Sequence, residues 1–98
     1  MSYSNQIIST KSTSASYEIV LKTLPEQGFN ITRRRDLANL VQASKEIEGV
    51  ARTFNVSCSM GKETKINVAC MSEGDSASEA EKAAVDELLK VLNEVVSA

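Results

Sequence analysis

The sequence predicts an α+β domain, an open-faced two-layer sandwich in the order β-α-β-β-α, with an antiparallel sheet and both helices on one face. Three observations predict it. Apolar and polar residues alternate over 50–60 and again over 66–70, which is the period of a strand with one buried face. Gly61-Lys62-Glu63 separates these runs as a short loop. A stretch with helical spacing follows and reaches Ser97.

The register of this hairpin follows from its pattern. Both apolar sets fall on even-numbered positions, and a three-residue loop pairs Cys58 with Ile66 and Val56 with Val68. A slip by one residue would turn one apolar set to solvent. Cys58 and Cys70 are therefore expected in the core as reduced thiols, where free cysteine behaves as a small hydrophobe.

The last helix is expected to begin at a capping box, Ser76-Ala77-Ser78-Glu79. The Ser76 hydroxyl can accept from the Glu79 N–H, and the Glu79 carboxylate can reach back to the Ser76 N–H. Apolar residues then recur at helical spacing, at Ala80, Ala84, Leu88, Leu92 and Val95.

The first half of the chain is predicted as a tail and one strand. Residues 1–16 are rich in Ser and Thr and predict a flexible N-terminal tail, whereas 17–98 form a single domain. Ile7-Ile8 is the tail's only large apolar pair, and it could instead add an edge strand or dock on a partner. Residues 17–24 are expected as the first strand, with Val20 on its outer face. A turn at Pro25–Gly28 ends that strand.

Residues 36–48 are expected to form the first helix. Leu37, Leu40, Val41 and Ile47 would make its apolar stripe. Thr32 is a candidate N-cap, and Gly49 would end the helix.

Composition bounds the class of protein. The chain has 98 residues, near the commonest domain size, with 42% hydrophobic and 24% charged residues and a net charge of −2. No stretch approaches the roughly 20 apolar residues of a membrane span. The N-terminus lacks a basic region followed by an apolar run. We therefore expect a cytoplasmic protein that does not enter a membrane.

The residue types needed for common catalytic and metal sites are missing. The sequence has no histidine, which removes Ser-His and Cys-His dyads and most zinc sites. Its four glycines form neither a P-loop nor a dinucleotide fingerprint. The expectation is a non-catalytic protein without a metal or another cofactor.

Arg33-Arg34-Arg35 is the one unusual cluster, and it abuts the predicted start of the first helix. Cations are unfavourable at the positive end of a helix dipole, so a bound anion would relieve the conflict. Lys62 and Lys65 at the hairpin tip could extend this basic patch. The other interpretation is a solvated basic turn that Asp36 partly neutralises.

The run FNVSCSMGKETKINVACMSEGDSASEAEKAAVDELLKVL, within residues 54–92, resembles the C-terminal half of a double-stranded-RNA-binding domain. It shares two strands, a Gly-Lys hairpin, and a Ser-initiated helix with an Ala-Ala pair at Ala83-Ala84. That family grips phosphates with lysines at the start of the helix. Ala77, Ser78 and Glu81 stand at those positions here, so the phosphate-binding lysines are missing.

Two functional hypotheses follow. The first is a small binding or assembly module that uses a sheet edge or the open sheet face to contact a protein partner or a second copy. The alternative is RNA or ribosome binding through Arg33, Arg34, Arg35, Lys62 and Lys65, which requires these residues to converge on one surface.

Overall fold

The computed structural model describes residues 2–71 and 79–96. Five strands form one sheet in the order β1-β5-β4-β3-β2, and every neighbouring pair is antiparallel. The elements are β1 (Ser2–Ser9), α1 (Thr13–Glu26), β2 (Asn30–Arg35), the short 3-10 helix η1 (Asp36–Ala38), β3 (Leu40–Ile47), β4 (Val50–Ser59), β5 (Thr64–Met71) and α2 (Glu79–Val96).

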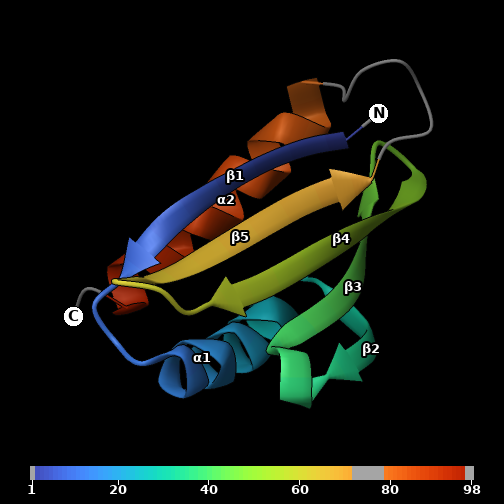
Figure 1. Ribbon diagram of the computed structural model, residues 1–98. Helices are drawn as coiled ribbons and strands as arrows, with labels where there is room; N and C mark the ends of the chain where they lie inside the picture. The colour runs from blue at the N-terminus through green and yellow to red at the C-terminus, as the bar shows by residue number, and fades with distance from the viewer. Residues whose placement is uncertain (1, 72–78, 97–98) are drawn as a thin grey trace.

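The α+β two-layer class is confirmed, with one helical layer against one face of the sheet. Helix α2 contacts β1 and β5, α1 contacts β4, and the two helices touch each other. Figure 1 shows both helices behind the sheet, which leaves its other face open toward the viewer. The predicted order β-α-β-β-α is wrong, because two further strands complete the sheet.

The predicted hairpin is confirmed with its register. Cys58 pairs with Ile66, and Val56 pairs with Val68, across β4 and β5. Both cysteines are buried and free. Met60 departs from the expected pattern, because β4 ends at Ser59 and leaves the Met60 side chain 83% exposed in the turn.

The expectation of a tail over residues 1–16 is wrong. Residues 2–9 form β1, which pairs along its full length with β5, as in Tyr3 with Cys70 and Ile7 with Ile66. Tyr3 and Ile7 pack against the core from this strand. The edge strand that Ile7-Ile8 could provide is therefore the observed structure, because the free side of β5 supplies the backbone partners that the local composition does not reveal.

The strand predicted over 17–24 is wrong, because these residues lie in helix α1. Ser12 is its N-cap, and the Ser12 Oγ accepts a 3.2 Å hydrogen bond from the Ala15 N–H. Tyr17, Val20 and Leu24 follow at helical spacing and are buried. Val20 thus belongs to the core rather than to an outer sheet face.

The helix predicted over 36–48 is also wrong, because most of this segment is β3. Val41 and Ala43 are fully buried at alternate positions, whereas Leu37, which a helical stripe would bury, is fully exposed in η1. Glu48 (φ 52°) and Gly49 (φ 82°) then form a two-residue turn into β4. Positive φ at both positions is what a type I′ hairpin turn requires.

Helix α2 is confirmed over residues 79–96, and the predicted capping residue Ser76 lies outside the described residues. Its buried face closes one continuous core, in which the Phe29 and Phe54 rings meet edge to face at 5.0 Å. The core residues are Tyr17, Val20, Leu24, Phe29, Val41, Ala43, Phe54, Val56, Cys58, Ile66, Val68, Cys70, Val85, Leu88, Leu89, Leu92 and Val96.

Candidate functional site

The two edges of the sheet differ in how they are protected. The β2 edge carries three arginines, and its pairing with β3 is interrupted by a bulge between Ile31 and Arg33. Bulges and charges are the usual devices that keep an edge strand from pairing with another chain. The β1 edge has neither: its sequence SYSNQIIS has no charge and no proline, and its register with β5 is unbroken.

One hydrogen bond shows which backbone groups of β1 face the free edge. The Gln6 N–H donates to its neighbour's side chain, Asn5 Oδ1, at 2.9 Å, and not to β5. Backbone groups in an antiparallel strand alternate between its two sides. The N–H and C=O groups of Ser4, Gln6 and Ile8 therefore point away from β5, toward an incoming strand.

A groove of about 540 Å³ lies between this edge and the last helix. We call it the β1–α2 groove, and its lining residues are Asn5, Gln6, Ile7, Ile8, Asp86, Leu89, Lys90 and Asn93. Figure 1 shows α2 running alongside β1 and extending past its free edge. The volume is within the range of pockets that bind ligands.

Polar contacts on the Asp86 carboxylate join β1 to α2. Asp86 Oδ1 accepts from the Tyr3 hydroxyl at 2.9 Å and from Asn5 Nδ2 at 3.3 Å. The hydrogen bond to Asp86 raises the pKa of the Tyr3 hydroxyl. Because Asn5 also holds the Gln6 N–H, this side chain links the edge of the sheet to the helix.

Apolar side chains flank the free edge on both faces of the sheet. Ile7 points toward α2 and packs on the core, near the buried Leu89. Ile8 points to the open face and is 50% exposed. Lys90 is exposed at the groove and supplies a cation there.

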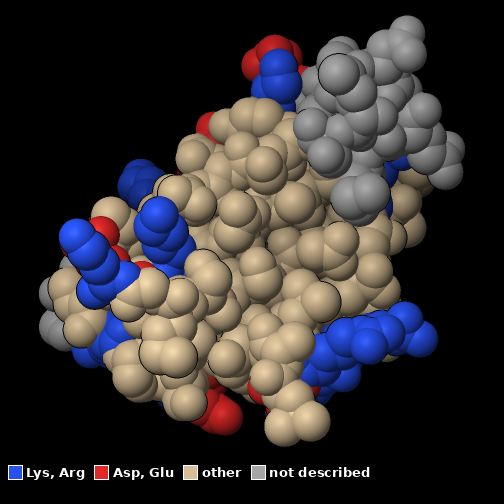
Figure 2. All heavy atoms as spheres, in the orientation of Figure 1, with Lys and Arg blue, Asp and Glu red and all other residues tan. Residues whose placement is uncertain are grey.

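The predicted basic cluster lies in a strand, so the expected anion site at a helix N-terminus is wrong. Arg33 and Arg35 pair with Gln42 and Leu40 of β3 and lie on the open face by alternation. Arg34 points to the opposite face and binds Asp36 through two 3.2 Å hydrogen bonds. Figure 2 shows one group of Lys and Arg side chains at the β2 end of this face and further groups at its opposite end, with mostly uncharged residues between them.

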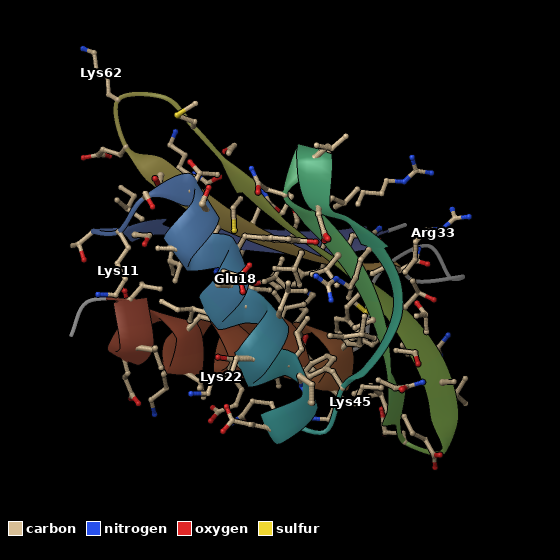
Figure 3. All side chains as sticks on the ribbon, turned by 90° about the horizontal axis from the view of Figure 1, so that it is seen from below. Lys11, Glu18, Lys22, Arg33, Lys45 and Lys62 are labelled. Carbon is tan, nitrogen blue, oxygen red and sulfur yellow. The ribbon has the colours of Figure 1, made fainter. Side chains whose placement is uncertain are left out.

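The two lysines do not complete this cluster. Lys62 lies in the β4–β5 turn, and Figure 3 shows it at the opposite end of the molecule from Arg33. Lys65 lies in β5, opposite Ser59 and Ile8. Two strands separate β5 from β2, so the fold brings together Arg33 and Arg35 alone of the five residues.

The described residues hold no group of three or more His, Cys, Asp or Glu side chains that could bind a metal ion. Burial raises the pKa of both the Cys58 and the Cys70 thiol to about 11, so both stay protonated at neutral pH. Within the described part of the chain, no helix combines the length and the apolar character needed to cross a membrane.

Sequence reasoning missed the β1–α2 groove, although a signal for it was present. Tyr3, Asn5 and Ile7 alternate with Ser4, Gln6 and Ile8 over a run that also fits a polar tail. What the pattern could not show is that β1 pairs with β5, a strand far along the chain, and so lies beside α2.

No known protein family and no curated protein matches the sequence. Among solved structures, the chain is similar to the crystal structure of Ara h 8.0201, with a TM-score of 0.50 and 10% sequence identity. The match covers 99% of this chain and 97% of that one. At this identity the similarity concerns the fold alone.

Proposed function

We propose that this protein is a non-catalytic binding module that takes an extended protein segment as a sixth strand on the free edge of β1. The observation that carries the proposal is the unprotected β1 edge beside the β1–α2 groove. Strand addition of this kind draws its affinity from main-chain hydrogen bonds and its specificity from pockets for alternate side chains.

The main-chain hydrogen bonds would come from Ser4, Gln6 and Ile8. The Gln6 N–H is already held by Asn5 Oδ1, so the incoming carbonyl exchanges one acceptor for another. When no partner is bound, the Asn5 side chain satisfies this one N–H, and the other edge-facing backbone groups of β1 stay available to an added strand.

Side chains of the added strand would alternate between the two faces. One set lies on the open face beside Ile8, where an apolar residue buries exposed surface at about 25 cal/mol per Å². The other set enters the β1–α2 groove, where Asp86 and Lys90 offer one carboxylate and one cation to polar side chains of the added strand. A second copy is one possible occupant, since two β1 edges can pair antiparallel about a two-fold axis.

Gln6→Pro tests the proposal, because it removes an edge-facing N–H without removing a hydrogen bond to β5. Peptides selected from a random display library against the wild-type protein should bind it and the matched control Gln6→Ala, but not Gln6→Pro. Sedimentation of all three proteins separates self-pairing from peptide capture. If the wild type stays monomeric and selects no peptide, or if Gln6→Pro binds the same peptides equally well, the proposal is wrong. An unchanged circular dichroism spectrum confirms that Gln6→Pro folds.

A further inference from the structure

We infer that Arg33 and Arg35 form a binding site for a small ligand with a terminal phosphate or carboxylate group, on the open sheet face at the end opposite β1. The two arginines, with Leu40, Gln42 and Asn55, line a hollow of about 100 Å³. This site is independent of the proposed strand addition, because β1 and β2 are the two opposite edges of the sheet.

Strand alternation places the two guanidinium groups on the same side of the sheet. Arg33 pairs with Gln42 and Arg35 with Leu40, and residues two apart in a strand are separated by roughly 6.5–7 Å. Each guanidinium presents a planar fork of N–H donors that matches the oxygens of a phosphate or a carboxylate. Two forks at this spacing can reach one oxyanion from two sides.

The charges of these arginines are not neutralised by the protein. Arg34 is paired with Asp36 at 3.2 Å, whereas neither Arg33 nor Arg35 makes an ion pair among the described residues. Over β2, β3 and β4, the open face carries one carboxylate, Glu46. Glu46 lies four residues from Gln42 along β3, about 13 Å away, which is beyond a Debye length at physiological salt.

Two amide side chains that line the hollow, those of Gln42 and Asn55, supply a further donor. The Thr32 Oγ1 donates to the Gln42 carbonyl at 3.2 Å, and Gln42 Nε2 donates to Asn55 Oδ1 at 3.3 Å. Because Asn55 Oδ1 is the acceptor, the Asn55 Nδ2 group retains its N–H donors for a ligand. The partly buried Leu40 is the one apolar side chain among the residues that line the hollow.

The size and lining of the hollow favour a small ligand over a nucleic acid strand. A space of about 100 Å³ holds several waters or one oxyanion group, but not a nucleotide. The open face of β2, β3 and β4 has no aromatic side chain on which a base could stack, because Phe54 points into the core. Lys62, which would extend a phosphate track, lies at the far end of the molecule (Figure 3).

Amide-detected NMR titrations of the full chain test the site, with inorganic phosphate, acetate and chloride as separate probes. Phosphate or acetate should give saturable shifts at the Asn55 side-chain amide and at the backbone of residues 33, 35 and 42. The probe that saturates at the lower concentration identifies the oxyanion. The double variant Arg33→Gln/Arg35→Gln should weaken binding at least about tenfold. The control Lys62→Gln/Lys65→Gln should bind as the wild type does.

Three outcomes would overturn the inference. One is the lack of saturable shifts with phosphate and acetate, and another is equal shifts with chloride, which indicate screening alone. The third is a single-stranded RNA oligomer that binds with a steep salt dependence and loses affinity in both double variants, since that result assigns the arginines to a nucleic-acid interface. Arg33→Lys/Arg35→Lys keeps both charges, and the inferred bidentate contact predicts that it binds more weakly than the wild type.

Discussion

The Tyr17 hydroxyl donates a 2.7 Å hydrogen bond to Asp36 Oδ1, and this contact ties helix α1 to the end of strand β2. The same hydroxyl lies 3.1 Å from the Leu40 carbonyl at the start of β3. Arg34 donates to both oxygens of the Asp36 carboxylate. One carboxylate thus holds Arg34 on the helix-side face of the sheet, while Arg33 and Arg35 stay on the open face.

We expect Tyr17→Phe to lower the free energy of unfolding by about 0.5–1.5 kcal/mol at neutral pH, because it removes hydrogen bonds from a buried side chain. Urea unfolding measures the change. The control Tyr3→Phe removes a hydroxyl whose hydrogen bond to Asp86 is exposed. It should therefore lower the free energy of unfolding less than Tyr17→Phe does. An equal loss in both variants would contradict the role given to the contact between Tyr17 and Asp36.

The same contact predicts how stability depends on pH. Burial and then the hydrogen bond to Asp36 raise the pKa of Tyr17 from 10.0 to about 12. The folded state therefore binds the Tyr17 proton more tightly than the unfolded state does. The resulting contribution to stability is complete below pH 10 and disappears as the pH rises toward 12. Burial also raises the pKa of both cysteine thiols to about 11, so Tyr17→Phe should reduce the alkaline loss of stability without abolishing it, which unfolding curves at pH 9 and above would show.

At acid pH the pKa shift of Asp36 has the opposite direction to that of Tyr17. Its hydrogen bond from Tyr17, and then that from Arg34, lower the pKa of this carboxyl below 3.8. The contribution of Asp36 to stability is therefore present above its pKa in the unfolded state. It is lost as the pH falls through its lower pKa in the folded state. Asp36→Asn should therefore flatten the loss of stability below about pH 4. An acid limb as steep as that of the wild type would contradict this assignment.

Arg52 and Glu81 make a further contact between strand and helix, with Arg52 Nε 3.7 Å from Glu81 Oε2. The Glu81 side chain is 3% exposed and that of Arg52 is 25% exposed. We expect Arg52→Met to destabilise the fold by about 1–3 kcal/mol, since it removes a countercharge from a buried carboxylate. Adding Glu81→Gln to Arg52→Met should restore part of this loss, and urea unfolding of the single and double variants measures it. A double variant no more stable than Arg52→Met would contradict the prediction.

Cys58 and Cys70 should react slowly with a bulky thiol reagent in the native protein and rapidly in urea. Their thiols are buried, and their pKa of about 11 leaves little of the reactive thiolate at pH 7. Cys58→Ala and Cys70→Ala identify the contribution of each residue to the rate. Fast labelling of either thiol in the folded state would contradict its placement in the core.

Glu48→Asn should stabilise the protein by about 0.5–1 kcal/mol. Glu48 has a φ of 52° in the turn before Gly49, a backbone conformation that glutamate disfavours and asparagine accepts. Thermal unfolding measures the gain, and Glu48→Gln, which keeps an unsuitable side chain, should show none. A loss of stability in Glu48→Asn would mean that the Glu48 side chain has a role in the turn.

Much of the C-terminal half could be predicted from the sequence, because local patterns there admit one interpretation. Alternation in 50–59 and 64–70 agrees with the turn between them, and it determines both the pairing of Cys58 with Ile66 and the burial of both thiols. Helix α2 has apolar residues at a helical period over five turns, which a strand cannot accommodate.

The N-terminal half depends on tertiary structure, because its patterns fit two periods. Tyr17, Ile19 and Leu21 alternate as in a strand, yet Tyr17, Val20 and Leu24 share a helix face, and the helix is what buries them against the sheet. Leu40, Val41 and Ile47 suggest a helix, yet the free side of β4 offers backbone partners that only a strand can use.

For the candidate sites, the sequence alone identified residue types and the tertiary structure decided their arrangement. The three consecutive arginines were evident, but the strand conformation of β2 splits them between two faces and leaves Arg33 and Arg35 together. Ile7-Ile8 was evident as a possible edge strand, but the groove beside it exists because β1 joins β5 and lies along α2. Contacts between segments so far apart in the chain depend on which sheet edge is free and which apolar face is still exposed. Local sequence patterns do not contain this information.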